Sequence, residues 1–479
     1  MKFCEVPLIF EKKVEKQQKN FVPKLDIDVI KIEEIIPQKF IRKEIPIPDI
    51  PEVEVVRHFI QLSQMNFGVD NGFYPLGSCT MKYNPKINEK LARLPGFTNI
   101  HPLQDENLGC LELMANLIKY LKEITGMNAF TLQPAAGAHG ELTGLLIMRK
   151  YFETQNLDKN KIIVPDSAHG TNPASARMAG FSTIELQSDE NGEVPLDQLE
   201  FAMEEGDVAG IMLTNPNTLG LFERKVKEIT KIVHENGGLC YYDGANLNPT
   251  LGICKPKDMG FDIVHLNLHK TFSTPHGGGG PGAGPIGVSE NLAEYLPVPR
   301  IMTLNDEIKI ITKGDNSIGR IKAFWGNFGV LIRAYAYILA LGGEGLKKVA
   351  QISVLNANYL RTQLKNLFYL PYDRICKHEF VLSDKNLPND VNTEDVAKRI
   401  LDFGCHAPTI YFPLIVSGAL MIEPTETESK ENLDNFIEIL RKIKEEAENS
   451  PEILKTAPHN TPIGRLDAVL AARKPILKK

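Results

Sequence analysis

Cysteine is scarce in this chain, and its spacing matches no structural cysteine motif. Seven cysteines occur among 479 residues, and no CxxC pair is present. Disulfide frameworks and zinc ribbons need paired or closely spaced cysteines, so the sequence indicates neither. We therefore expect mostly reduced thiols. The seven are Cys4, Cys79, Cys110, Cys240, Cys254, Cys376 and Cys405.

Long apolar runs and an excess of basic charge are also missing. No apolar run approaches the roughly 20 residues that span a bilayer, and Met1–Glu5 is followed by mixed charge rather than by a signal-peptide core. The formal net charge is −6 and the pI is near 6.1. Such a chain has neither a basic field for nucleic acid nor a polybasic membrane patch. We expect a cytoplasmic protein that binds neither nucleic acid nor membrane.

Nucleotide-binding motifs are absent, whereas an α/β alternation is present. Neither GxxxxGK[ST] nor a GxGxxG turn after the first strand occurs. Short apolar runs separated by helical segments are typical of a mainly parallel sheet, here seven-stranded, in a three-layer domain. Ligands then bind beyond the carboxyl ends of the strands. The runs are 129–133, 162–164, 182–187, 208–213, 239–242, 261–268 and 285–288, and the helical segments are 139–155, 173–179, 196–205 and 224–236.

The same patterns suggest how the chain is divided. Residues 1–52 read as an extended arm, because Ile45–Pro51 alternates apolar residues with proline, which disfavours central strand pairing. We expect a large domain over 53–320 and a linking helix over 321–345, within a helical pattern that begins near residue 318. A smaller α+β domain should follow over 346–479. An arm with large apolar side chains needs a partner surface, so we expect it to wrap another subunit; a loosely attached tail is the alternative.

One lysine stands out because of what surrounds it. A β-branched apolar run brings Lys270 to its end, with His269 just before it and the glycine loop Gly277–Gly280 soon after. Burial disfavours the charged form of an amine, and a neutral amine is a nucleophile toward a carbonyl. Any single lysine is more often a surface residue, so the residues at the other strand ends must show whether Lys270 belongs to a site.

Polar residues follow three other strands. Asp243 ends the run 239–242 and is either structural or a partner for a protonated pyridine nitrogen. His169 follows the run 162–164 and either stacks on a flat ring or only makes hydrogen bonds. Thr214 and Asn215 either bind a phenolic oxygen or form an ordinary Asn-Pro turn.

A turn of small residues opens the first helix of the α/β pattern. Ala136, Gly137 and Ala138 lie at its start, and helix N-termini present free N–H groups to anions. The turn is either a phosphate site or tight packing. Together with Lys270, Asp243 and His169 it forms the set that pyridoxal phosphate needs.

A metal site is the competing interpretation of this region, because His265 and His269 are four residues apart. On a helix they would share a face and could bind zinc. We predict an extended strand here, which would separate them by about 13 Å, too far for one ion.

Six stretches resemble the family of glycine dehydrogenase (decarboxylating), the P-protein of the glycine cleavage system, and within it subunit 2 of the two-chain form. The resemblance covers roughly residues 55–470 and implies fold type I of the pyridoxal-phosphate enzymes, the aspartate-aminotransferase-like architecture. The stretches are Tyr74–Pro85, Gln133–Gly144, Asp166–Ala176, Leu213–Phe222, Tyr242–Asn246 and Asn267–Gly284.

The resemblance implies roles for the residues already singled out. Lys270 should hold pyridoxal 5'-phosphate as a Schiff base, Asp243 should pair with the ring nitrogen, and His169 should stack on the ring. The remaining expected cofactor contacts are the turn Ala136-Gly137-Ala138 and Thr271 at the phosphate, with Ala245, Thr214 and Asn215 around the ring.

The implied reaction is decarboxylation of glycine with transfer of the aminomethyl group to the lipoyl arm of H-protein. An arginine clamp would stabilise the ground-state carboxylate that must disappear, so we expect looser polar contacts. His269 is expected to be catalytic, and Gly277–Gly280 to form a lip for the lipoyl arm. The expected substrate contacts are Ser78, Cys79, Thr80 and His139. A redox role for Cys79 is the alternative to a packed thiol.

The resemblance also implies an unlike partner chain, P-protein subunit 1, in an α2β2 assembly. Two alternatives remain open. An aminotransferase or amino-acid lyase of the same fold would use the same lysine and aspartate. A non-catalytic interaction subunit would not need Lys270 and Asp243, which are both present.

Overall fold

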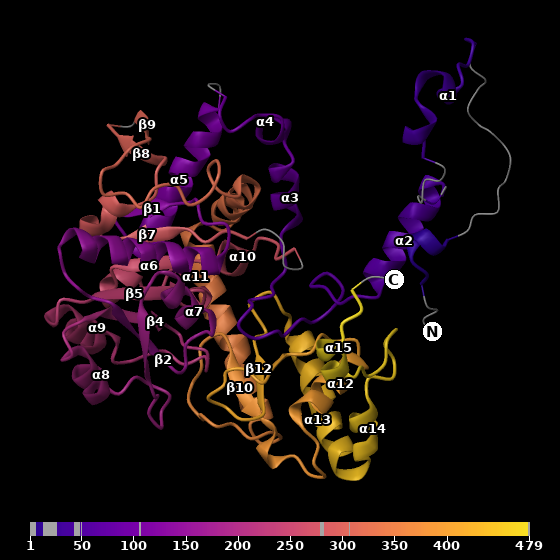
Figure 1. Cartoon of the computed structure of the whole chain (residues 1–479). Coiled ribbons are helices and arrows are strands. Elements are labelled where there is room, and N and C mark those ends of the chain that lie inside the picture. Colours follow the sequence, from indigo (N-terminus) through magenta and orange to yellow (C-terminus); the bar gives the residue numbers. More distant parts are fainter. Residues whose placement is uncertain are drawn as a thin grey trace. The chain divides into compact units, whose positions relative to one another are not determined.

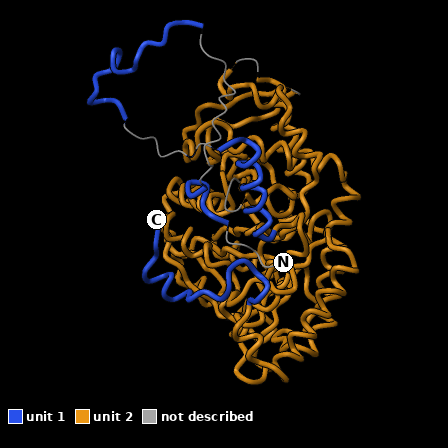
Figure 2. Tube along the Cα trace, turned by 90° about the vertical axis from the view of Figure 1, so that its right-hand side faces the viewer, with its two compact units in different colours: residues 1–67, 458–479 blue, residues 68–457 orange. Residues whose placement is uncertain are grey.

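The computed structural model describes the chain except for residues 1–5, 13–25, 43–47, 49, 105–106, 278–281, 306 and 478–479. The chain divides into two compact units, residues 68–457 and residues 1–67 together with 458–479 (Figure 2). Gly278–Gly280 of the predicted lip and most of Ile45–Pro51 lie outside the described residues. The domain boundaries predicted at residues 52, 320 and 345 stay predictions.

A seven-stranded sheet with the order β1-β7-β6-β5-β4-β2-β3 forms the centre of residues 68–457 (Figure 1). The pairs from β3 to β6 are parallel, and only β7 runs against its neighbours. The predicted mainly parallel sheet is therefore confirmed. The strands are β1 (Ala129–Thr131), β2 (Lys161–Pro165), β3 (Ser182–Leu186), β4 (Val208–Thr214), β5 (Leu239–Gly244), β6 (Ile263–Leu266) and β7 (Ile286–Val288).

Helices cover both faces of this sheet, so its central strands are buried on both sides. One apolar cluster joins a sheet face to α5, α8, α9 and α11, and another joins the opposite face to α6 and α7. All the predicted helical segments between the strands are present. The helices are α5 (Leu108–Thr125), α6 (Gly137–Thr154), α7 (Thr171–Met178), α8 (Leu196–Met203), α9 (Val226–Glu235) and α11 (Phe328–Leu364).

The helix expected from about residue 318 begins only at Phe328. Gly319, Phe324 and Gly326 have φ values of 82°, 56° and 99°, and the left-handed region is incompatible with a right-handed helix. Within α11, Gly342 is non-helical at φ 60° and ψ −178°, so two helices meet at a kink there. The helix extends from the seven-stranded sheet to the C-terminal sheet (Figure 1).

The smaller C-terminal part contains an antiparallel sheet with the order β10-β12-β11. Its apolar face packs against the second half of α11 and against α13. Strand β11 ends at Ile410, because Tyr411 has φ 56° and Pro413 has no N–H to donate. The elements are β10 (Phe380–Ser383), α12 (Thr393–Leu401), β11 (Thr409–Ile410), β12 (Ala419–Ile422), α13 (Lys430–Asn449) and α14 (Pro451–Thr456).

Shorter elements complete residues 68–457. A hairpin of β8 and β9 extends the chain after β7, and single turns of 3-10 helix connect several strands and helices. These elements are α3 (Lys86–Ala92), α4 (Pro95–Thr98), η3 (Asn248–Thr250), η4 (Pro256–Met259), η5 (Glu290–Tyr295), β8 (Arg300–Leu304), β9 (Glu307–Ile311) and η6 (Asp384–Asn386).

The other unit has little buried apolar surface of its own. Phe10 is 70% exposed and Val29 is 73% exposed, and α2 presents several large apolar side chains to solvent. Such side chains are rarely left uncovered in a group. Its elements are η1 (Ile9–Glu11), α1 (Ile32–Ile35), η2 (Gln38–Phe40), α2 (Glu52–Gln64) and α15 (Ala468–Arg473).

By length and composition alone, one of the described helices could cross a membrane, and that helix is α11. Its first half packs Val330, Leu331 and Ala334 into the large apolar cluster. A buried core helix passes the same test as a membrane span, so α11 is weak evidence for one.

Candidate active site

Lys270 lies in a one-turn helix rather than at the end of a strand. Strand β6 ends at Leu266, and α10 (Leu268–Thr271) carries the lysine, which is only 9% exposed. The expected strand to residue 268 is therefore wrong in its last two residues, and so is the extended spacing assumed between His265 and His269. Among the described residues, the groups of three or more metal-competent side chains do not contain this pair together.

A buried lysine anchors the turn that carries Lys270. The Lys82 ammonium donates to the carbonyl oxygen of Thr271 at 2.8 Å, to Asn248 Oδ1 at 2.9 Å and to Glu426 Oε1 at 2.8 Å. It also lies 3.1 Å from the Tyr337 hydroxyl. One side chain thus ties α10 to the loop before α3, to α11 and to the segment after β12.

Asp243 lies near the end of β5, the strand that neighbours β6. The register pairs it with Thr214 on β4 and with His265 on β6, so three polar residues form one row across the sheet. Asn172 Nδ2 donates to its Oδ2 at 3.0 Å, and the Ala245 N–H donates to its Oδ1 at 2.9 Å. The carboxylate is 1% exposed.

Two neighbours complete the surroundings of Asp243. His265 Nε2 lies 3.1 Å from Asp243 Oδ1, although the angle is not that of a hydrogen bond. The other ring nitrogen of His265 lies 3.1 Å from the Tyr241 hydroxyl. Burial alone would raise the pKa of Asp243, but His265, the Ala245 N–H and Asn172 lower that pKa below its usual value. The site therefore holds an ionised carboxylate in a dry environment.

His169 follows β2 and is half-buried. Its Nδ1 accepts from the Thr171 N–H at 3.2 Å, and the Thr171 hydroxyl donates to Glu141 Oε1 at 2.8 Å. The ring centroid lies 5.4 Å from that of Phe412. Burial and then the Lys270 charge lower the pKa of His169, which favours the neutral ring.

The two candidates at the end of β4 are engaged within the protein. The Thr214 hydroxyl donates to Asp243 Oδ2 at 3.3 Å. Asn215 Oδ1 accepts from the Glu223 N–H at 2.9 Å. The structure thus brings Thr214 to the aspartate, whereas the oxygen of Asn215 serves the following loop.

The small-residue turn forms the N-terminus of α6. Ala136 is the N-cap residue and has no side-chain cap, and both Ala136 and Ala138 are exposed. Gly137 is buried against Asn267, since a Cβ there would lie 2.4 Å from Asn267 Oδ1. His139 Nδ1 accepts from the Ala135 N–H at 3.1 Å, and burial lowers the pKa of this histidine. An open helix end with free N–H groups is suited to an anion.

The loop containing Ser78, Cys79 and Thr80 reaches this region from the N-terminal side. Ser78 and Thr80 have φ values of 63° and 48°, a conformation that costs free energy for residues with a Cβ. The Cys79 carbonyl lies 2.9 Å from His276 Nε2. Burial raises the pKa of the Cys79 thiol, with Lys270 acting in the opposite direction, so the thiol form predominates.

His269 and His276 form a perpendicular pair with ring centroids 5.3 Å apart. Burial, with a smaller contribution from Lys270, lowers the pKa of His269 to about 3 and that of His276 to about 4. Both rings are neutral at physiological pH. The His269 Nδ1 atom is buried and has no hydrogen bond within the described part of the chain.

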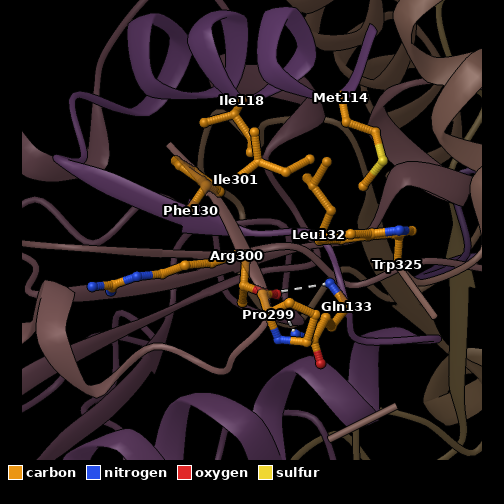
Figure 3. Close-up of a pocket in the computed structure, with 10 residues that line it drawn as sticks. Met114, Ile118, Phe130, Leu132, Gln133, Pro299, Arg300, Ile301 and Trp325 are labelled. Carbon is orange, nitrogen blue, oxygen red and sulfur yellow. Dashed lines mark hydrogen bonds between the residues drawn. The ribbon is translucent and has the colours of Figure 1, made fainter. Parts of the chain in front are cut away.

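A small cavity elsewhere in the protein is not part of this site (Figure 3). Its volume is about 10 Å³, which is room for about one water molecule. The Gln133 amide donates to the Pro299 carbonyl at 2.9 Å at its edge, and Thr131 and Arg300 line it together with apolar side chains. A cofactor does not fit there.

Comparison with known proteins decides the family. The model of the glycine cleavage system P-protein matches residues 11–309, and that of the glycine dehydrogenase C-terminal domain matches residues 349–461. The chain belongs to the glycine cleavage system P-protein family. It is 57% identical over 476 residues to a probable glycine dehydrogenase (decarboxylating) subunit 2 from Caldanaerobacter subterraneus, covering 98% of each chain. A protein of the same description from Kosmotoga olearia is 58% identical over 474 residues, again with 98% coverage of each.

Solved structures support the fold of this P-protein family member. A glycine decarboxylase (P-protein) in inhibitor-bound form aligns with a TM-score of 0.71 at 20% identity, covering 86% of this chain and 94% of that one. An aspartate aminotransferase from Thermus thermophilus aligns with a TM-score of 0.57 at 14% identity, covering 78% and 99%. These likenesses show the fold alone, and the predicted fold type I architecture is confirmed.

Several polar residues of the P-protein site were not foreseen from sequence. Lys82 lies within a recognised stretch, but a lysine in a loop carries no sign of burial. His265 was considered only as a metal ligand, and Glu141 and Asn172 only as parts of longer stretches. The pairing Asp243↔His265 follows from strand register, so the alternation pattern of β5 and β6 was the signal that could have found it.

Proposed function

We propose that this chain uses pyridoxal 5'-phosphate to decarboxylate glycine and transfers the aminomethyl group to the lipoyl arm of H-protein. Two buried groups carry the proposal, the amine of Lys270 in the turn after β6 and the ionised carboxylate of Asp243 on the neighbouring strand β5. They occur in a chain that shares 57% identity with a probable glycine dehydrogenase (decarboxylating) subunit 2. When bound, pyridoxal phosphate supplies an electron sink for the bond that breaks.

The residues present fit this cofactor. Thr271 Oγ1, Thr274 Oγ1 and Asn267 Oδ1 are buried polar atoms without hydrogen bonds among the described residues, and all follow β6. Unpaired buried polar atoms are costly unless a ligand uses them. The N-terminus of α6, with Gly137 against Asn267, supplies N–H groups for a phosphate.

Asp243 would hold a proton on the ring nitrogen of the cofactor. Asn172 and the Ala245 N–H keep this carboxylate ionised, and His265 lies on its other side. An ionised partner favours the protonated nitrogen, and hence electron withdrawal. His169 would lie on the ring face, and Lys270 would hold the aldehyde carbon. Ala245, Thr214 and Asn215 stay predicted ring contacts.

The glycine carboxylate would meet neutral groups. With a pKa near 3, His269 can donate or accept a hydrogen bond but carries no charge at neutral pH. Neutral contacts orient the carboxylate without stabilising its charge strongly, so they oppose decarboxylation less than an arginine would. Ser78, Thr80 and His139 stay predicted contacts of the same kind, and Cys79 a predicted neighbour.

Partners follow from the same proposal. We place P-protein subunit 1 beside this chain in an α2β2 assembly in the cytoplasm. Lipoylated H-protein is the acceptor, and Gly277–Gly280 stays the predicted lip for the lipoyl arm. The exposed apolar side chains of residues 1–67 support an arm that covers a partner. Deleting residues 1–50 should therefore lower the oligomeric state in light scattering, and an unchanged assembly would contradict the arm.

The decisive experiment is exchange of labelled CO2 into the carboxyl group of glycine, with subunit 1 and H-protein present. We expect exchange in the wild type and none with Lys270→Ala, which should also lose the borohydride-sensitive visible absorbance. Amine transfer dependent on 2-oxoglutarate, without exchange, would instead establish an aminotransferase. A protein that stays colourless after soaking with the cofactor would indicate a non-catalytic subunit.

A further inference from the structure

Two glutamates face each other at the end of the small sheet that is nearest the site. The antiparallel register pairs Phe380 of β10 with Ile422 of β12, so the next pair outward is Glu379 with Glu423. Both side chains are 0% exposed. Like charges directly opposite on neighbouring strands destabilise a sheet, and burial makes that repulsion stronger.

Each glutamate holds the backbone of the loop beside Lys270. The Ser78 N–H donates to Glu379 Oε2 at 2.7 Å, and the Thr80 N–H donates to Glu423 Oε2 at 2.9 Å. These are the two loop residues with positive φ. The carboxyl pair therefore stabilises a backbone conformation that the loop would not adopt by itself.

The other two carboxylate oxygens, Glu379 Oε1 and Glu423 Oε1, are buried in a small polar cluster with His378. Glu379 Oε1 and Glu423 Oε1 form no well-aligned hydrogen bond among the described residues, although the Thr80 hydroxyl is close enough to Glu423 to lower its pKa. His378 Nε2 lies 3.6 Å from Glu379 Oε1, and neither ring nitrogen has a hydrogen-bond partner in the described chain. One atom from each of the three side chains lies within 4.8 Å of the other two.

Burial and mutual repulsion prevent both carboxyls from being ionised together. Burial raises the pKa of Glu423 to about 7, and burial together with Glu423 raises the pKa of Glu379 well above its usual value. The charged or titratable groups that act on the pair are Lys270, Glu426, Cys79 and His378; burial lowers the pKa of His378 to about 3, so that ring is neutral.

We propose that Glu379 and Glu423 share a proton and act as positioning residues, holding the Ser78–Thr80 loop beside Lys270 while limiting the negative charge that faces the site. The proton lies on an Oε1 atom of the pair, because each Oε2 already accepts a backbone N–H. No bond other than this O–H bond forms or breaks.

The consequence for catalysis rests on the proposed function. Glycine brings a carboxylate into the region of the Ser78–Thr80 loop. A pair with one proton carries one negative charge, which Lys270 can offset, whereas a fully ionised pair carries two. Loss of the shared proton should therefore repel the substrate and loosen the loop, and KM for glycine should rise about tenfold per pH unit beyond that titration.

The first test compares Glu379→Gln and Glu423→Gln with the wild type. A glutamine keeps an acceptor for the loop N–H and mimics a carboxyl that never loses its proton. We expect each variant to keep kcat within about threefold and to lose the alkaline rise in KM for glycine. The control Glu446→Gln removes from α13 a carboxylate that pairs with Arg399 of α12, and it should keep the wild-type profile. An alkaline rise in KM that persists in both variants would overturn the proposal.

The second test needs neither cofactor nor activity. A carboxyl pKa raised in the folded state gives stability that is present below the ordinary value of 4.5 and is lost as pH rises through about 7. The unfolding midpoint of the cofactor-free protein should therefore fall between about pH 5 and about pH 8, and Glu423→Gln should flatten that fall. If the unfolding midpoint changed equally with pH in the wild type and in Glu423→Gln, proton sharing would be overturned, even if the wild type catalysed CO2 exchange into glycine.

A bound divalent cation is the other way to satisfy His378, Glu379 and Glu423. The observations favour a proton, because each Oε2 already accepts an N–H and the Lys270 charge acts on the same group. Elemental analysis of the purified protein decides between them. A stoichiometric metal that Glu379→Gln loses would overturn the proposal, and a metal-free protein with the flattened profile would support it. Absence of exchange in the wild type would overturn the proposed function but leave the stability test valid.

Discussion

Replacing Lys82 with methionine tests how the turn that carries Lys270 is held. The Lys82 side chain is 1% exposed and its ion-pair partner Glu426 is 7% exposed. Burial would lower the pKa of Lys82, but Glu426 and Tyr337 raise it above its usual value, so the lysine is charged. Methionine keeps the apolar stem and removes the ammonium, which leaves Glu426 as a buried charge without its cation.

The magnitude follows from that unpaired charge. Breaking one side of a buried ion pair costs about 3–5 kcal/mol, and the Thr271 carbonyl and Asn248 Oδ1 lose their donor at the same time. We expect Lys82→Met to lower the free energy of unfolding by about 4 kcal/mol, roughly a thousandfold in the unfolding equilibrium. Adding Glu426→Gln removes the stranded charge, so the double variant should regain about half of the loss.

Lys86 is a matched control four residues away. Its ammonium pairs with Asp70 at 2.5 Å, but the two side chains are 56% and 52% exposed. An exposed pair contributes at most about 1 kcal/mol, so Lys86→Met should change stability little. Urea unfolding followed by circular dichroism measures the wild type, the single variants Lys82→Met, Glu426→Gln and Lys86→Met, and the double variant. If Lys82→Met cost no more than Lys86→Met, or if the double variant lost the sum of the single losses, the reasoning would be refuted.

Three other changes have expected outcomes. Asp243→Asn should lower kcat in the exchange assay about 10- to 100-fold, because an amide cannot hold the ring proton as a charged group does. Gly137→Ala should weaken pyridoxal phosphate binding in fluorescence titration, since its Cβ would lie 2.4 Å from Asn267 Oδ1. His234→Gln should remove stability below about pH 6.5, because the hydrogen bond with Asp262 raises the pKa of the histidine and this contribution is lost as pH rises.

Each of these three changes can be separated from general damage. Gly109→Ala is the control for Gly137→Ala, because a Cβ at Gly109 meets nothing within 4 Å; loss of binding in both would contradict the local explanation. An Asp243→Asn protein with wild-type exchange would contradict the assigned role. Parallel pH profiles of unfolding in wild type and His234→Gln would show that the histidine does not contribute.

The strands and helices could largely be predicted because apolar periodicity reports burial. The runs of β4 and β5 are buried on both faces, and their sequences show it. Chain turns that depend on backbone conformation were not predictable from periodicity. The helix expected from about residue 318 does not begin there, because Gly319, Phe324 and Gly326 take left-handed conformations. Two of these three residues are glycine.

Candidate site residues could be proposed from sequence where polar residues follow apolar runs, and not where their position depends on tertiary neighbours. Lys270 and Asp243 follow apolar runs, which is a local signal. Glu379 and Glu423 also flank apolar runs, but 44 positions separate them in sequence. Only the pairing of β10 with β12 brings them together, and only the Ser78–Thr80 loop gives them partners. Nothing local distinguishes such glutamates from surface residues.

The loop from Leu76 to Lys82 is where the two sheets influence one another. Leu76 forms a β-bridge with Ile422, the last residue of β12, and the N–H groups of Ser78 and Thr80 donate to the glutamate pair. Six residues later, Lys82 binds the Thr271 carbonyl in the turn that carries Lys270. A change in charge at the glutamate pair must therefore act on the same short segment that anchors the lysine turn. One loop therefore contacts both the turn that carries Lys270 and the buried glutamates beside β10 and β12.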